Sequence, residues 1–62
     1  MRNKHKKVLI SALTTISEYM TATAETMIHL DIKEPEIIEH GHELKGAAKI
    51  MQSWIKGIED IK

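Results

Sequence analysis

The chain contains no cysteine and no phenylalanine, and it has only one proline among 62 residues. Without cysteine, disulfides and thiolate metal sites are excluded. A chain of this length forms one domain at most, in the size range where a single core is marginal and disulfides, metals or self-association usually supplement it. Because disulfides are excluded, self-association is the supplement that the sequence favours.

Neither sign of charge dominates the chain, and no apolar run is long. Nine Lys and Arg balance nine Asp and Glu, so no overall field attracts nucleic acid or an anionic membrane. Residues 1–7 hold a local cluster of bases, and we expect them to form a basic, flexible arm. No apolar run approaches the roughly 20 residues needed to cross a bilayer. We therefore expect a cytoplasmic protein without a membrane partner.

Apolar residues recur at helical spacing in two stretches of the chain. In both, the spacing alternates between four and three residues, which keeps one stripe of side chains on one side of a helix. This pattern predicts helices over residues 8–30 and 35–61. The first stripe is Leu9, Leu13, Ile16, Met20, Thr23, Met27 and Leu30, and the second is Ile37, Gly41, Leu44, Ala48, Met51, Ile55 and Ile58.

A short connection separates the two predicted helices. Pro35 suits the first turn of a helix, where the backbone amides have no partner, so the second helix begins at or near it. Asp31 and Glu34 have the spacing of a capping box one turn earlier, which leaves this boundary open by a few residues. A turn as short as residues 31–34 makes the helices antiparallel neighbours. We predict an all-α fold with one domain, a helical hairpin over residues 8–62.

Both apolar stripes are wider than one partner helix requires, because further apolar residues such as Tyr19 and Ile50 lie beside them. A homodimer that joins two hairpins into a four-helix bundle would cover the excess. In layout the chain resembles the plasmid repressor-of-primer proteins, which are dimeric helical hairpins. Gly41 and Ala48 occupy stripe positions where two backbones would approach closely. The residues that we expect to mediate binding and oligomerisation are Leu13, Ile16, Met20, Met27, Gly41, Leu44, Ala48, Met51, Trp54 and Ile55.

The outer face of the first predicted helix is rich in Ser and Thr and has no Lys or Arg between Val8 and Ile32. Such hydroxyls can bond back to the carbonyl one turn earlier. The face is therefore either partly buried against another helix or simply solvated, and the sequence leaves both alternatives open.

The four histidines do not form a metal-binding pattern. His40 and His42 are two residues apart, so on a helix they point roughly 200° away from each other. Glu36 and His40 are one turn apart, but two ligands do not complete a site. The chain also lacks a Gly-rich phosphate loop and a nucleophile elbow. We expect no metal, no cofactor and no enzymatic activity.

One local motif points to a different function. The run from His42 through Leu44, Lys45 and Gly46 to Ala48 resembles the phosphoacceptor motif of histidine phosphotransfer domains. The resemblance implies that His42 accepts a phosphoryl group, that Lys45 neutralises it, and that Gly46 leaves the ring accessible to a docking receiver domain. Residues three and four after the histidine lie beside it on a helix, which is consistent with these roles.

The leading hypothesis is a non-enzymatic, homo-oligomeric helical protein that binds another macromolecule. It would act as a regulator, inhibitor or adaptor of phage or plasmid type, with another protein as partner. The alternative is a minimal phosphotransfer module that uses His42. Nucleic-acid binding through the basic residues 1–7 is the least favoured function, because no aromatic residue in this segment could stack on bases.

Overall fold

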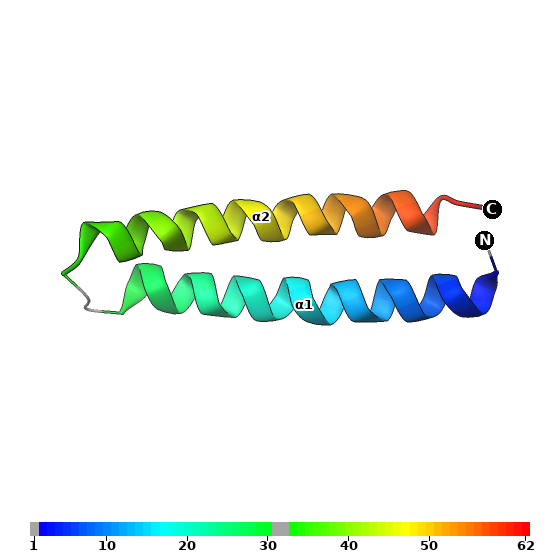
Figure 1. The fold of residues 1–62 in the computed structure, drawn as a ribbon, viewed down its shortest axis with the longest axis horizontal. Coiled ribbons are helices and arrows are strands. Elements are labelled where there is room, and N and C mark those ends of the chain that lie inside the picture. The colour runs from blue at the N-terminus through cyan, green and yellow to red at the C-terminus, as the bar shows by residue number, and fades with distance from the viewer. Residues whose placement is uncertain (1, 31–32) are drawn as a thin grey trace.

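A computed structural model describes residues 2–30 and 33–62, and in this part of the chain two helices form and no strand does. Helix α1 spans Asn3–His29 and helix α2 spans Pro35–Glu59. The helices run side by side in opposite directions, so both chain termini lie at one end and the turn lies at the other (Figure 1). The hairpin measures 47 × 14 × 11 Å along its principal axes. The predicted all-α helical hairpin is confirmed.

The first helix begins earlier than we expected. The backbone amide of Lys6 donates to the carbonyl of Arg2 at 3.0 Å, so the basic segment forms the first turn of α1. The Lys6 ammonium also donates to the carbonyl of Ile61 at 2.5 Å. This places a positive charge beside the carboxyl end of α2, where a helix dipole favours it. Lys and Arg are good helix formers, so the helix extends through them instead of ending at Val8.

The second helix begins where the proline predicts. Pro35 occupies its first turn and Glu34 is the N-cap residue, whose carbonyl accepts hydrogen bonds from the amides of Ile37 and Ile38 at 3.0 and 3.3 Å. The Glu34 side chain makes no capping bond. Asp31, the first residue of the possible capping box and of the predicted turn, lies outside the described residues.

We call the surface along which the helices meet the seam. The sequence predicted the α2 side of the seam better than the α1 side. On α2, every residue of the predicted stripe is buried or half-buried. On α1 only Leu13, Met20 and Met27 are, whereas the other four stripe residues are exposed. The seam of α1 is instead rotated toward residues at positions 10, 17 and 24, where the side chains include Ser17 and Ala24. The predicted α1 stripe is therefore displaced to one side of the seam, and only three of its residues lie in the seam.

The rotation has a steric cause. Ser17 and Ala24 are the most deeply buried residues of α1, at 2 % and 0 % exposure, and the buried residues of α2 are the equally small Gly41 and Ala48. Small side chains on both helices let the two backbones approach closely, which larger residues such as Ile16 would prevent. The core is correspondingly thin. Among the described residues no large side chain is fully buried.

The hydroxyl-rich face of α1 combines both of the expected environments. Thr21 is half-buried, whereas Thr15 and Thr26 are exposed. All three donate to the carbonyl four residues earlier, at 2.9 to 3.0 Å. These bonds satisfy the hydroxyls within the helix, so the face needs no partner to be stable. No described helix is sufficiently long and apolar to span a membrane.

Candidate functional site

The two helices approach each other closely at Gly41. A β-carbon added to this residue would lie 2.8 Å from the Cγ1 of Ile28, 3.1 Å from the Cβ of Met27 and 3.2 Å from the carbonyl oxygen of Ala24. The contact with Ile28 is closer than real β-carbons come and the other two are tighter than most, so a side chain here requires Ile28 to move and α1 to shift slightly. Gly41 therefore permits the close spacing of the two helices at this point.

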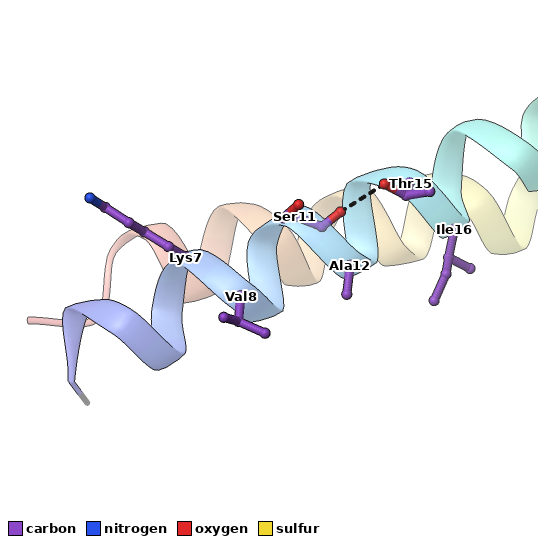
Figure 2. A pocket seen from close by; sticks show the side chains of 6 residues that line it. All are labelled: Lys7, Val8, Ser11, Ala12, Thr15 and Ile16. Atoms are coloured by element: carbon purple, nitrogen blue, oxygen red, sulfur yellow. Dashed lines mark hydrogen bonds between the residues drawn. The ribbon is translucent and has the colours of Figure 1, made fainter.

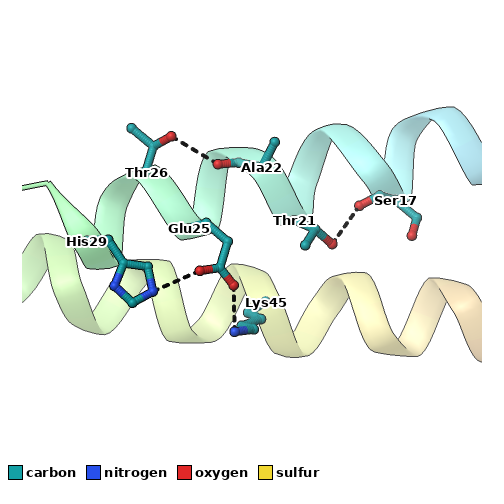
Figure 3. Close-up of polar contacts among 7 residues, drawn as sticks. All are labelled: Ser17, Thr21, Ala22, Glu25, Thr26, His29 and Lys45. Atoms are coloured by element: carbon teal, nitrogen blue, oxygen red, sulfur yellow. Dashed lines mark hydrogen bonds and ion pairs between the residues drawn. The ribbon is translucent and has the colours of Figure 1, made fainter.

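One flank of the seam, which we call the polar flank, joins the helices through polar side chains. The Lys45 ammonium lies 2.6 Å from the Glu25 carboxylate across the seam, and His29 Nε2 lies 2.8 Å from the same carboxylate (Figure 3). Further toward the termini, the Gln52 amide donates to the hydroxyl of buried Ser17 at 3.3 Å. These contacts show that Glu25, Lys45 and Gln52 lie on one face of the hairpin.

The Glu25 carboxylate is electrostatically stabilised by this arrangement. The hydrogen bond from Lys45 and the charge of its ammonium lower the pKa of Glu25 below the usual value, with a further contribution from His29. Partial desolvation acts in the opposite direction. Both Lys45 and Glu25 are about 40 % exposed, so solvent screens the pair and its net contribution to stability is small.

The phosphotransfer-like motif occupies the middle of α2. His42 is exposed, and a β-carbon on Gly46 would meet nothing within 4 Å, so the space beside these residues is open. Lys45, however, is paired with Glu25 across the seam. To neutralise a phosphoryl group on His42, the Lys45 ammonium would first have to leave this carboxylate. Phosphotransfer therefore stays a hypothesis, because His42 is accessible but Lys45 is already paired with Glu25.

The other histidine of α2 has only loose acidic neighbours. His40 Nε2 lies 3.7 Å from Glu36, and its Nδ1 lies 3.8 Å from Glu43. All three side chains are more than half exposed, which leaves them free to move in solvent. Among residues 2–30 and 33–62, no group of three or more His, Cys, Asp or Glu is placed to hold a metal ion.

Exposed apolar side chains are concentrated in the half of the hairpin that contains the termini. Among residues 2–30 and 33–62, Leu30 is the one exposed large apolar residue that lies near the turn. Ile16 and Trp54, both predicted to mediate oligomerisation, are 48 % and 56 % exposed. The exposed large apolar residues in the described part of the chain are Val8, Leu9, Ile16, Tyr19, Leu30, Ile50, Trp54 and Ile61.

Shallow hollows on the described surface include one on each helix. The first runs along the terminal half of α1, where Val8, Ala12 and Ile16 project from one side of the helix, while Ser11 and Thr15 lie on the other (Figure 2). The second lies at the turn end of α2 and combines the apolar surface of Pro35 and Ile38 with polar neighbours. Its lining residues are Lys33, Pro35, Ile38, Glu39 and His42.

The residues predicted to mediate binding and oligomerisation fall into two groups. Eight of them lie in the seam of the hairpin itself: Leu13, Met20, Met27, Gly41, Leu44, Ala48, Met51 and Ile55. Ile16 and Trp54 lie outside the seam and are exposed. Sequence reasoning missed Ser17 and Ala24 as central seam residues. The signal that could have identified them is a pair of small residues seven apart, matched by Gly41 and Ala48 on the other helix.

The chain matches no protein-family model, no curated protein and no solved structure among those with which we compared it.

Proposed function

We propose that this protein is a non-enzymatic, homo-oligomeric helical hairpin that functions by binding another macromolecule. It would act as a small regulator, inhibitor or adaptor in the cytoplasm, with a protein as its partner. Balanced charge over the whole chain and an apolar surface in the terminal half both suit protein partners better than nucleic acid.

The observation that carries this proposal is the large surface area of the hairpin. Its accessible surface is 4901 Å², whereas a folded monomer of this mass exposes about 4,100 Å². The difference of roughly 800 Å² is comparable to the area that one partner buries in a standard protein interface. Since no large described side chain is fully buried, the hairpin gains little stability from its own core. Both facts support association.

Self-association leaves a second surface for another partner at the turn end. This end carries exposed Leu30 and the hollow lined by Pro35, Ile38 and His42. Apolar groups bordered by Lys33 and Glu39 suit a protein segment that presents apolar and charged side chains together.

The first experiment measures the mass of the protein in solution. Light scattering on a sizing column should give at least twice the chain mass of 7.1 kDa at micromolar concentration. A well-folded monomer under these conditions would contradict the homo-oligomeric part of the proposal.

The second experiment tests partner binding by affinity capture from the native host. The wild-type bait should enrich a specific protein, and a Leu30→Asn bait should lose it because the turn-end surface is altered. A bait with scrambled sequence provides the background. Enrichment of nuclease-sensitive material instead would support the basic segment as a nucleic-acid site, and no enrichment over background would contradict partner binding.

A minimal phosphotransfer module remains the alternative function. The exposed ring of His42 and the open space at Gly46 favour it. The ion pair between Lys45 and Glu25 does not, because it occupies the lysine that the motif requires.

A further inference from the structure

Several exposed apolar residues of the two helices lie on the same face of the hairpin. Each residue of an α-helix is rotated by roughly 100° from the one before, so the residues before and after a seam position lie on opposite sides of the seam. Glu25 follows the seam residue Ala24, and Lys45 follows the seam residue Leu44. Because Glu25 and Lys45 contact each other, the residues that follow seam positions share one face.

The residues that precede seam positions must then share the opposite face. On α1, Ile16 precedes Ser17, and on α2, Trp54 precedes Ile55 and Ala47 precedes Ala48. Leu9 likewise precedes Ile10. We call this face the apolar flank; it consists of Leu9, Ile16, Ala47 and Trp54, bordered by Ala12, Tyr19 and Ile50.

The hydrogen bond between Ser17 and Gln52 sets the two helices in register. Trp54, two residues beyond Gln52, therefore lies across the hairpin between the levels of Leu9 and Ile16. The apolar flank is thus one continuous patch that is centred near Trp54. Along it, large residues such as Ile16 alternate with the small residues Ala12 and Ala47, as in surfaces where the side chains of two helices interdigitate.

Charge is distributed unevenly along the hairpin, which bears on how a second copy would lie. The terminal end of α1 carries the bases Arg2, Lys4, Lys6 and Lys7, whereas the turn end of α2 carries the acids Glu34, Glu36, Glu39 and Glu43. Two copies in parallel would bring like charges together at both ends. Two antiparallel copies would move the basic end of each toward the acidic half of the other.

We propose that the apolar flank binds the same flank of a second copy, an inference that rests on the proposed homo-oligomeric function. The two copies lie antiparallel and are related by a two-fold axis near Trp54. The hairpin exposes roughly 800 Å² more than a typical monomer of its mass, which is comparable to the area that each partner buries in a standard interface. Leu30 lies beyond the end of the partner copy in this arrangement, and the turn ends project in opposite directions.

Matched variants test which face is buried. Ile16→Asn and Leu30→Asn remove apolar side chains of similar exposure, 48 % and 54 %. Sedimentation equilibrium should show that Ile16→Asn raises the dimer dissociation constant by about tenfold or more, while Leu30→Asn leaves it unchanged. A wild-type monomer would overturn the proposed function as well as this interface. A dimer that neither variant weakens would overturn the interface alone, and one that both variants weaken would overturn the antiparallel arrangement.

A distance measurement that leaves the apolar flank unchanged tests the proposal even if Ile16→Asn does not fold. The chain has no cysteine, so a Lys33→Cys variant carries a single spin label at the turn. Electron–electron dipolar spectroscopy should give roughly 60 Å between the two labels, since about 20 helical residues separate the axis from each turn at about 1.5 Å each. A distance below about 25 Å would mean that the copies lie parallel and would overturn the proposal.

Discussion

Replacing Gly41 by alanine tests whether close backbone contact determines the hairpin. At an unconstrained position inside a helix, Gly→Ala stabilises by about 1 kcal/mol, because glycine loses more conformational entropy on folding. At Gly41 the new methyl group would lie within 3.2 Å of three atoms of α1. Ile28 can rotate away, but the Cβ of Met27 and the carbonyl oxygen of Ala24 are fixed to the backbone, so α1 itself must move.

Overpacking of this kind costs about 1 to 3 kcal/mol, which outweighs the gain in helix propensity. We therefore expect Gly41→Ala to lower the free energy of unfolding by up to about 2 kcal/mol. Gly46 provides the matched control, since a β-carbon there meets nothing within 4 Å. Gly46→Ala should raise the free energy of unfolding by about 1 kcal/mol.

The assay is urea denaturation followed by circular dichroism, with all proteins at the same concentration because association contributes to stability. The two variants should differ by about 1 to 3 kcal/mol, with Gly41→Ala the less stable. If both substitutions stabilise the protein equally, α1 and α2 do not approach closely at Gly41. Gly41 would then not determine the spacing of the hairpin.

Three further predictions concern separate residues. Ala48 is 1 % exposed and should not accept a larger side chain, so Ala48→Leu should lower the free energy of unfolding by about 1 to 3 kcal/mol or change the oligomeric state. An unchanged melting temperature and mass would mean that Ala48 is not buried. Because the folded-state pKa of Glu25 is lowered, its small stabilising contribution is present above the unfolded carboxyl pKa and is lost as the pH falls through the folded pKa. Glu25→Gln should slightly flatten the loss of stability in this acid range, and an NMR titration in which the pKa of Glu25 is not lowered would contradict the ion pair. If His42 is a phosphoacceptor, a phosphorylated receiver domain or a small phosphoramidate should produce acid-labile phosphate that His42→Gln abolishes without unfolding the protein; no labelling by any donor would exclude phosphotransfer.

The hairpin could be predicted from the sequence because its signals are local. Pro35 marks the start of α2, and the alternating spacing of apolar residues marks both helices. The seam of α2 could also be predicted, since Leu44, Met51 and Ile55 form a single apolar stripe. The physical reason is that α2 has charged residues on the face opposite its seam, so the pattern leaves only one orientation.

The orientation of α1 could not be predicted in the same way. Its apolar residues cover a broad sector, and both Ile10 and Ile16 could face α2. The choice depends on a tertiary effect, the close approach of Ser17 and Ala24 to the small residues of α2, and hydrophobic periodicity does not report that effect. The consequence for the candidate site is direct. The large residues that the periodicity assigned to the seam, such as Ile16, are instead left on the surface.

The dependence of the melting temperature on protein concentration tests the central claim, that one hairpin is half of a stable unit. If folding requires a second copy to cover the apolar flank, unfolding and dissociation occur together. Each tenfold increase in protein concentration adds about 1.4 kcal/mol of association free energy. Divided by the unfolding entropy of two chains, this should raise the melting temperature by about 5 °C. A midpoint that stays constant over a hundredfold range, with a mass of 7.1 kDa throughout, would show that the hairpin folds alone and would contradict the claim.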